Sequence, residues 1–169
     1  EYLGNLKAQD APEWQEFVNA LTTNLTSFFR ETHHFDILLT HLKNGHGGRP
    51  WKMWCSAAST GEEPYSIAMT AVEAIGERGE FSLTASDIDS KVLSAASKGV
   101  YKVESLKGFS EDRLVRFFRR WRGKNVGFAC VKLLLQQNIQ LVNVNLTRDD
   151  WTFREPFDLV FCRNVMIYF

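Results

Sequence analysis

The stretch SAASTGEEPYS, residues 56–66, joins a predicted buried strand to a predicted helix. Its small residues allow a ligand to approach the main chain, and Thr60 and Glu63 have the spacing of a capping box. Gly61 is the only glycine in this stretch, whereas a dinucleotide-binding loop or a Walker A loop requires several glycines at fixed spacing. Two adjacent acids, Glu62 and Glu63, disfavour phosphate near the helix start and suit a cationic ligand. Simple capping with solvated acids explains the stretch equally well.

Strands and helices are predicted to alternate on either side of this turn. We expect strands at residues 51–57, 81–86, 139–144 and 157–162, and helices at residues 61–75 and 90–98. This order is typical of a parallel sheet with right-handed crossovers. The sequence therefore predicts an α/β fold.

Other segments lie outside this alternation. We expect helices at residues 13–21, 27–42 and 110–122, a loop at 44–50, and an extended segment at 126–135 that forms a hairpin with 139–144. The glycine-rich loop marks a domain boundary, with N-terminal helices in residues 1–45 and the main domain in residues 46–169. Ser110 and Asp89 are expected to cap the helices that follow them.

Composition narrows the classes of function. Of the 169 residues, 44% are hydrophobic and 24% charged, and twenty basic residues balance twenty acidic ones. This favours a soluble globular protein and gives no sign of a nucleic-acid partner or of membrane insertion. Three cysteines without metal-ligand spacing predict reduced, buried thiols, a cytoplasmic location and no metal. The chain lacks an initial Met and stops within an apolar run, so we expect a longer protein.

Polar residues follow three of the predicted strands. Asp87 comes where nucleotide-binding sheets hold ribose hydroxyls, and Asn145 offers the paired hydrogen bonds that an adenine edge requires. Arg163, Asn164 and Tyr168 come at the carboxyl edge of the last strand. The prolines of base-flipping methylases are absent there, which disfavours a nucleic-acid substrate.

Upstream of the sheet, Arg30 ends the stretch NLTSFFR of residues 24–30. An arginine among apolar residues needs a partner if it is buried, and a bound carboxylate would be one.

Taken together, the segments NLTSFFRETHHF, SAASTGEEPYSIA, ASDID and FDLVFCRNVMIYF are similar, in order and spacing, to the CheR-type chemotaxis receptor methyltransferases. The resemblance implies a class I, Rossmann-like methyltransferase sheet, incomplete at the C-terminus, with N-terminal helices. A small antiparallel β subdomain would be inserted at about residues 104–139. It also implies methyl transfer from S-adenosylmethionine, giving S-adenosylhomocysteine, to glutamates on the cytoplasmic helices of chemoreceptors. In some members the subdomain docks a receptor's C-terminal tail.

The resemblance also implies roles for individual residues. Arg30 and Tyr168 would be catalytic. The cofactor-binding residues would be Asn24, Thr26, Arg30, Glu62, Asp87, Asn145, Leu146, Arg163 and Asn164. Within this set Glu62 would lie near the amino-acid tail of the cofactor, Asp87 at its ribose, and Asn145 with Leu146 at its adenine.

Two other functions stay open on the sequence. One is a methyltransferase for a different protein or a small molecule, and the other is a non-enzymatic module that binds S-adenosylmethionine as a signal. A cluster of basic residues, Arg113, Arg116, Arg119, Arg120, Arg122 and Lys124, is interpreted as a solvated helix face. Its alternative is a contact surface for an acidic receptor segment.

Overall fold

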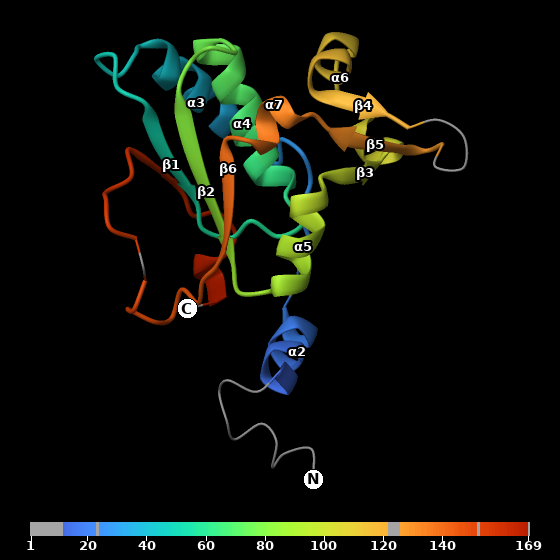
Figure 1. The fold of residues 1–169 in the computed structure, drawn as a ribbon, viewed down its shortest axis with the longest axis vertical. Coiled ribbons are helices and arrows are strands. Elements are labelled where there is room, and N and C mark those ends of the chain that lie inside the picture. Colours follow the sequence, from blue (N-terminus) through green and yellow to red (C-terminus); the bar gives the residue numbers. More distant parts are fainter. Residues whose placement is uncertain (1–11, 23, 122–125, 152, 169) are drawn as a thin grey trace.

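A four-stranded parallel sheet forms the centre of the computed structural model, which describes residues 12–22, 24–121, 126–151 and 153–168. The strands are β1 (Trp51–Cys55), β2 (Phe81–Asp87), β6 (Ile139–Asn143) and β7 (Leu159–Phe161), in the spatial order β6-β2-β1-β7. Each neighbouring pair is parallel, and Figure 1 shows β1, β2 and β6 side by side. The predicted α/β fold and parallel sheet are confirmed.

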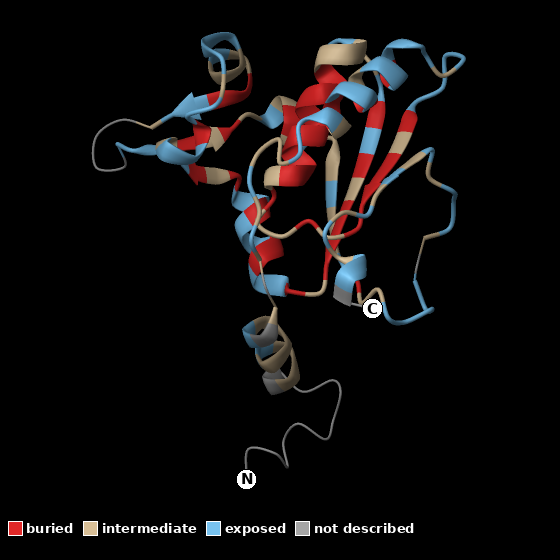
Figure 2. Cartoon of the chain, turned by 180° about the vertical axis from the view of Figure 1, so that it is seen from behind, coloured by how far each residue is buried: buried red, intermediate tan, exposed pale blue. Residues whose placement is uncertain are grey.

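Helices α3 (His33–Lys43) and α4 (Glu62–Ile75) cover one face of this sheet, as Figures 1 and 2 show from opposite sides. Helix α5 (Ser90–Lys98) packs against β2 and β6, and α2 (Pro12–Leu21) contacts α5. The buried residues in Figure 2 concentrate on α4 and the strands beneath it. Helix α4 is therefore the central helix of the core.

The N-terminal helices and the sheet share one core. Phe35, Leu38 and Leu42 of α3 are buried in the same cluster as Met53 of β1 and Ile67 of α4. The division of the chain at residues 45 and 46 remains a prediction, because no observation tests it.

The second helix begins later than the sequence predicted. It starts at His33 rather than near residue 27, and residues 28–32 form turns and bends. The main-chain φ angles of Phe29 and Glu31 are 51° and 56°, in the left-handed region that an α-helix cannot accommodate. This break carries the residues before α3 over the edge of the sheet.

A second, antiparallel sheet is inserted between β2 and β6 along the chain. It contains β3 (Val100–Lys102), β4 (Phe118–Arg120) and β5 (Phe128–Val131) in the order β3-β5-β4. The 3-10 helix η1 (Val103–Leu106) and α6 (Glu111–Phe117) connect β3 to β4. The small sheet projects to one side of the main sheet in Figure 1. The presence of an inserted antiparallel sheet, as predicted, is therefore confirmed.

Two details of this region were predicted wrongly. The helix expected at residues 110–122 ends at Phe117, because Phe118–Arg120 pairs with β5. The expected hairpin between 126–135 and 139–144 does not exist: β5 belongs to the small sheet and β6 pairs with β2, and the short helix α7 (Leu133–Gln136) separates them. Local sequence favours extended structure in both segments but does not specify the pairing.

The expected helix caps give a mixed result. Asp89 accepts hydrogen bonds from the main-chain N–H groups of Lys91 and Val92, and Ser110 accepts one from Arg113, so both caps are confirmed. The capping box of Thr60 and Glu63 is wrong: Gly61 occupies the N-cap position of α4 with no side-chain cap. The hydroxyl of Thr60 instead donates to the carboxylate of Glu62 at 2.6 Å.

The three cysteines are free, as expected, but they are not all buried. Cys55 is buried, Cys130 is partly buried and Cys162 is exposed. Among the helices that the structure describes, none has the length and apolar character needed to cross a bilayer.

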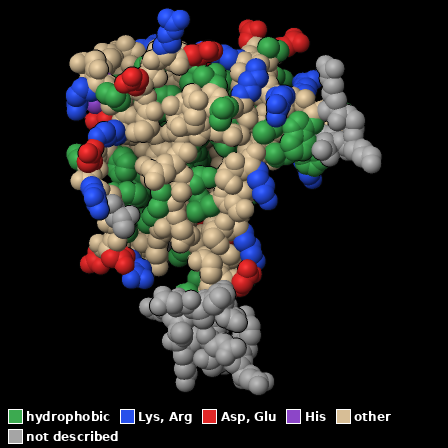
Figure 3. Space-filling model, viewed as in Figure 1, with side chains coloured by type: hydrophobic (Ala, Val, Ile, Leu, Met, Phe, Trp, Pro, Cys, Tyr) green, Lys and Arg blue, Asp and Glu red, His purple; other side chains and the backbone are tan. Residues whose placement is uncertain are grey.

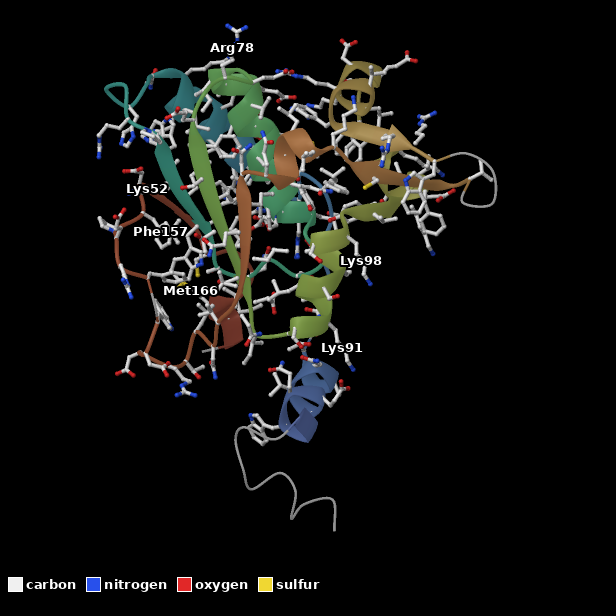
Figure 4. The ribbon with its side chains drawn as sticks, viewed as in Figure 1. Lys52, Arg78, Lys91, Lys98, Phe157 and Met166 are labelled. Atoms are coloured by element: carbon white, nitrogen blue, oxygen red, sulfur yellow. The ribbon has the colours of Figure 1, made fainter. Side chains whose placement is uncertain are left out.

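The face of the main sheet opposite α3 and α4 is only partly covered. The segment after β6 returns across it and brings Phe153 and Phe157 against Trp54 of β1, with ring centroids 4.9 and 5.5 Å away. Figure 4 shows Phe157 and Lys52 on neighbouring segments at this face, and Figure 3 shows hydrophobic side chains distributed across this side of the molecule. Strand β7 is an edge of the sheet.

Candidate functional site

A cavity of about 350 Å³ lies at the carboxyl ends of the parallel strands. In sheets of this type, ligands bind in the crevice at that edge. The lining residues are Thr22, Asn24, Leu25, Thr26, Arg30, Ser56, Ala57, Ser59, Glu63, Asp87, Ile88, Val144, Asn145, Leu146, Thr147, Arg163, Asn164 and Val165. Eight of the predicted site residues are in this set: Asn24, Thr26, Arg30, Asp87, Asn145, Leu146, Arg163 and Asn164.

Asp87 ends β2 with its carboxylate facing the turn that follows β1. One oxygen accepts a hydrogen bond of 2.8 Å from the N–H of Ser59, and the other accepts one of 3.0 Å from the N–H of Asp89. Burial raises the pKa of Asp87, and these main-chain hydrogen bonds partly oppose the rise. A carboxylate oxygen can accept more than one hydrogen bond, so Asp87 is held in place and still able to accept from a ligand.

The second buried acid of the cavity is Glu63, not the predicted Glu62. Glu63 points inward from the first turn of α4 and forms an ion pair of 2.8 Å with Arg163. Glu62 binds Thr60 and is not part of the lining. Burial raises the pKa of Glu63, whereas Arg163 lowers it. The sequence offered both acids, and only the rotation of α4 against the sheet distinguishes them.

Arg163 connects three segments of the cavity wall. Its guanidinium binds Glu63, lies 3.2 Å from the carboxylate of Glu31, and donates to the main-chain oxygen of Arg30 at 2.5 Å. Its side chain is only 10% exposed, and its guanidinium carbon lies over the ring of Phe35. The Nε atom is buried and has no hydrogen-bond partner within the described part of the chain.

Cys55 extends the polar network beneath the cavity. Its thiol donates to Glu63 across 3.4 Å. The cysteine is fully buried, so desolvation, reinforced by the charge of Glu63, raises the pKa of its thiol well above the ordinary value. A thiol held neutral in this way is a hydrogen-bond donor to Glu63 and a poor nucleophile.

The segment before α3 closes the cavity from the other side. The amide of Asn24 donates to Asp89 at 3.0 Å, and the main-chain oxygen of Asn24 accepts from Ser59 at 3.3 Å. Thr26 and Arg30 follow on the same wall. The guanidinium of Arg30 donates to the main-chain oxygen of Leu25 at 3.0 Å, and this bond folds the side chain back along its own segment.

The residues after β6 and β7 complete the lining. The amide oxygen of Asn145 accepts from both the N–H and the hydroxyl of Thr147, at 2.9 and 2.7 Å. Asn164 has a φ angle of 55° and lines the cavity opposite. The main chain of Tyr168 lies in the 3-10 helix η3 (Met166–Tyr168), but its side chain is outside the described residues.

Two residues of the cavity lining were not predicted from the sequence. Ser59 and Glu63 both line the cavity; Ser59 acts through its main-chain N–H, which no sequence pattern reports. No group of His, Cys, Asp and Glu side chains with metal-site geometry occurs within the described ranges.

The predicted basic cluster is partly engaged in ion pairs. Arg113 binds Glu73 of α4 through two nitrogens, at 2.7 and 2.8 Å, and Arg116 lies 3.2 Å from Glu77. Arg119 and Arg120 are exposed, and the rest of the cluster lies outside the described residues. The interpretation as a solvated face is therefore wrong for Arg113, because its ion pair with Glu73 links α6 to α4.

Comparisons with known proteins agree with this geometry. Residues 24–169 match the family model described as CheR methyltransferase, SAM binding domain, where SAM denotes S-adenosylmethionine. The chain is 48% identical to the chemotaxis protein methyltransferase of Salmonella typhimurium and 46% identical to that of Escherichia coli K12, over 99% of this chain in both cases. It is 47% identical to chemotaxis protein methyltransferase 2 of Pseudomonas aeruginosa over the whole chain.

The chain spans about three-fifths of the length of these curated relatives: 58% of the Salmonella protein, 59% of the Escherichia coli protein and 61% of the Pseudomonas protein. The family model covers the main sheet, the inserted sheet and every residue of the cavity except Thr22. This chain belongs to the CheR family of SAM-binding methyltransferase domains.

Proposed function

We propose that the full-length protein transfers a methyl group from S-adenosylmethionine to glutamate side chains of chemotaxis receptors, forming glutamate methyl esters. The cavity at the carboxyl edge of the sheet carries this proposal, because two buried acids and two arginines line it together. Family membership and the names of the relatives support the same reaction. We place the reaction in the cytoplasm, on the cytoplasmic helices of the receptors.

The residues of the cavity fit the cofactor. Asp87 has free acceptor capacity for ribose hydroxyls, and Glu63 supplies negative charge to the cavity lining, which suits an ammonium. The guanidinium of Arg163, which lines the same cavity, suits an acceptor such as the cofactor's carboxylate. We assign the adenine to Asn145 and Leu146, and the remaining wall to Asn24, Thr26 and Asn164.

The methyl group comes from the sulfonium of the bound cofactor. The acceptor glutamate is already ionised near neutral pH, since its reference pKa is about 4.3, so the protein needs no strong general base. Its residues act by positioning and by excluding water. We assign Arg30 to orient the acceptor carboxylate, and Tyr168 to shape the channel through which the methyl group passes.

The geometry of Arg30 supports an orienting role. Arg30 is a half-buried residue of the cavity wall, and one nitrogen of its guanidinium is occupied by the main-chain oxygen of Leu25. The remaining donors can hold a carboxylate without a fully formed bidentate pair, which would weaken the nucleophile by neutralising it.

The direct test is methyl transfer to receptor-containing membranes. The full-length protein is incubated with methyl-labelled S-adenosylmethionine and the membranes, and the label is then treated with mild base. Release of labelled methanol is expected, because esters are labile to base. Label that resists base would indicate an amine product and a different acceptor. Cofactor binding without any transfer would indicate a signalling module.

A variant tests the role of Arg30. Arg30→Ala should lower the rate of transfer per bound cofactor by roughly 10-fold to 100-fold, because the acceptor carboxylate loses its orienting partner. Arg78→Ala is the matched control, since Arg78 is an exposed arginine in the loop after α4, outside both the cavity and the small sheet. An unchanged rate per bound cofactor in Arg30→Ala would exclude the role.

We also propose the small sheet as the place where a receptor's C-terminal tail docks. Phe128 of β5 and the neighbouring Val126 are exposed apolar side chains on this sheet, and Arg119 and Arg120 of β4 add positive charge. Binding of a peptide with the sequence of the receptor tail, measured by calorimetry at two salt concentrations, tests this partner.

A further inference from the structure

Tyr101 lies outside the cavity but contacts two of the segments that form it. It is the middle residue of β3 in the small sheet and is 7% exposed. Its hydroxyl donates a hydrogen bond of 2.8 Å to the main-chain oxygen of Thr60, in the turn between β1 and α4. Its ring packs edge-on against Phe28, with centroids 4.8 Å apart. One side chain thus connects the inserted sheet to both sides of the cavity.

The turn that Tyr101 contacts has an unfavourable main-chain conformation. Ser59 has a φ angle of 47°, which is uncommon for a residue with a side chain, and Gly61 has a φ angle of 101°. Such residues keep their conformation only when the surrounding structure holds them. A Cβ atom on Gly61 would lie 2.6 Å from the hydroxyl of Tyr101, so the tyrosine fills the space directly beside the turn.

The conformation of this turn determines where the N–H of Ser59 points. That N–H donates to Asp87 at 2.8 Å, and the hydroxyl of Ser59 donates to the main-chain oxygen of Asn24 at 3.3 Å. A shift of the Thr60 carbonyl would therefore move a donor that fixes Asp87. Tyr101 has no contact with the cavity itself, so any effect on the ligand is transmitted through the turn.

The other side of Tyr101 holds the segment before α3. Phe28 packs edge-on against Phe109 and Phe118 as well as Tyr101, with centroids 5.3 and 5.8 Å away from the first two. The residues on either side of this ring, Thr26 and Arg30, line the cavity. The aromatic cluster of Phe28, Tyr101, Phe109 and Phe118 therefore fixes the position of this wall from the small sheet.

We propose that Tyr101 is a positioning residue for the cofactor site, and that the inserted sheet braces both walls of the cavity through it. Its hydroxyl holds the turn that presents the N–H of Ser59 to Asp87, and its ring holds the segment that carries Arg30. The small sheet thus supports cofactor binding in addition to any docking role. The inference rests on the proposed function, because it takes the cavity ligand to be S-adenosylmethionine.

The test uses Tyr101→Phe in the full-length protein, with Tyr65→Phe as its control. Tyr65 is 4% exposed, and its hydroxyl donates to a main-chain oxygen, that of Ala96, at the same distance of 2.8 Å. Both substitutions remove one buried hydrogen bond of the same kind, so a similar loss of stability is expected from each. Of the two hydroxyls, only that of Tyr101 contacts the turn beside Asp87.

Calorimetric binding of S-adenosylhomocysteine provides the first measurement. Tyr101→Phe should weaken binding about threefold to tenfold, which is the size expected for one lost hydrogen bond, and Tyr65→Phe should stay within about twofold of the wild type. In turnover, Tyr101→Phe should raise KM for the cofactor while kcat changes little. Equal affinities for wild type and Tyr101→Phe would overturn the inference alone. A wild-type protein that fails to bind S-adenosylhomocysteine would overturn the proposed function and, with it, the ligand assumed here.

Hydrogen exchange provides a second measurement that needs no ligand. In the ligand-free protein, amides of residues 57–61 should exchange faster in Tyr101→Phe than in wild type, because the turn loses its contact with β3. The same amides should be unaffected in Tyr65→Phe. Equal exchange of this turn in the two variants would show that Tyr101 contributes only general stability, which would also overturn the inference.

Discussion

The two walls of the cavity are held in different ways. On the sheet side, main-chain groups provide the support: the N–H of Ala58 donates to Ser86 and the N–H of Ser59 donates to Asp87, both at 2.8 Å. On the opposite side, one side chain, that of Arg163, links Glu63 and the segment at Arg30. The sheet side depends on hydrogen bonds donated by main-chain N–H groups. The opposite side depends on side chains, namely the buried charge of Arg163 and the aromatic cluster around Phe28.

The two walls should therefore respond differently to amino-acid substitution. A wall built from main-chain hydrogen bonds tolerates most side-chain changes, because every residue supplies the same N–H and C=O groups. A wall that depends on a buried ion pair fails when one partner is removed, since the other charge is left without compensation. The next four predictions test this contrast, beginning with the largest expected effect.

Removing Arg163 should have the largest effect. Arg163→Met keeps much of the side-chain volume but leaves Glu63 buried and unpaired, so we expect a loss of about 3 kcal/mol in the free energy of unfolding. Lys91→Met is the control, because the pair of Lys91 and Glu16 is about 60% exposed on each side and should contribute under about 1 kcal/mol. Figure 4 shows Lys91 at the end of α5, away from the main sheet. Urea unfolding gives both values, and equal losses would contradict the contrast.

On the sheet side, only a substitution that disturbs the main chain should strongly lower the free energy of unfolding. Gly61→Ala combines a φ angle of 101° with a Cβ that would lie 2.6 Å from Tyr101 and 2.9 Å from Ala96, so we expect a loss of about 2 kcal/mol. Gly47→Ala shares the positive φ but has no atoms within 4 Å of the new Cβ, and should cost about 1 kcal/mol. If urea unfolding gives the same loss for both, crowding at Gly61 is unimportant.

Replacement of Asp87 should affect binding more than the architecture of the wall. Asp87→Asn removes the charge and one acceptor, so the affinity for S-adenosylhomocysteine should fall about 10-fold. Asp158→Asn is a control with an acid at another edge of the sheet, where it accepts from Lys52. Calorimetry with the full-length protein measures both variants. Unchanged affinity in Asp87→Asn would show that Asp87 does not contribute to binding of S-adenosylhomocysteine.

The smallest expected effect is a pH dependence of stability at Asp87. Burial raises the pKa of Asp87 above its ordinary value of 3.8, so the folded state favours the neutral acid. The stabilising contribution is therefore complete below about pH 4 and is lost as pH rises through the folded pKa. Asp87→Asn lacks this contribution at every pH.

The measurement compares urea unfolding of wild type and Asp87→Asn from pH 4 to pH 7. The stability of the wild type relative to the variant should decline as pH rises. The contribution of Glu63, whose pKa is also raised, is present in both proteins and cancels. A relative stability that rises with pH would show that hydrogen bonds to the ionised form outweigh its burial.

Residues at the ends of strands could be predicted from the sequence, whereas the choice between neighbouring helix residues and the pairing of strands could not. Asp87 follows an alternating strand pattern and Asn145 follows another, so the rule that ligands bind at the carboxyl edge of a parallel sheet placed both at the cavity. The choice between Glu62 and Glu63 was missed, because neighbouring helix residues differ only by rotation about the axis. The hairpin expected after residue 126 was missed because strand propensity does not identify the partner strand.

Short-range sequence patterns were enough to predict the alternation of strands and helices, the caps at Asp89 and Ser110, and the polar residues at the strand ends, since each depends on neighbours within a few positions. The folded arrangement, in contrast, was needed to show that Arg163 joins Glu63 and Arg30, which are 100 and 133 positions away. It also decided that Tyr101 of the inserted sheet contacts the turn at Thr60. Contacts at such separations depend on how the sheets and helices pack, and packing is set by all the buried surfaces together.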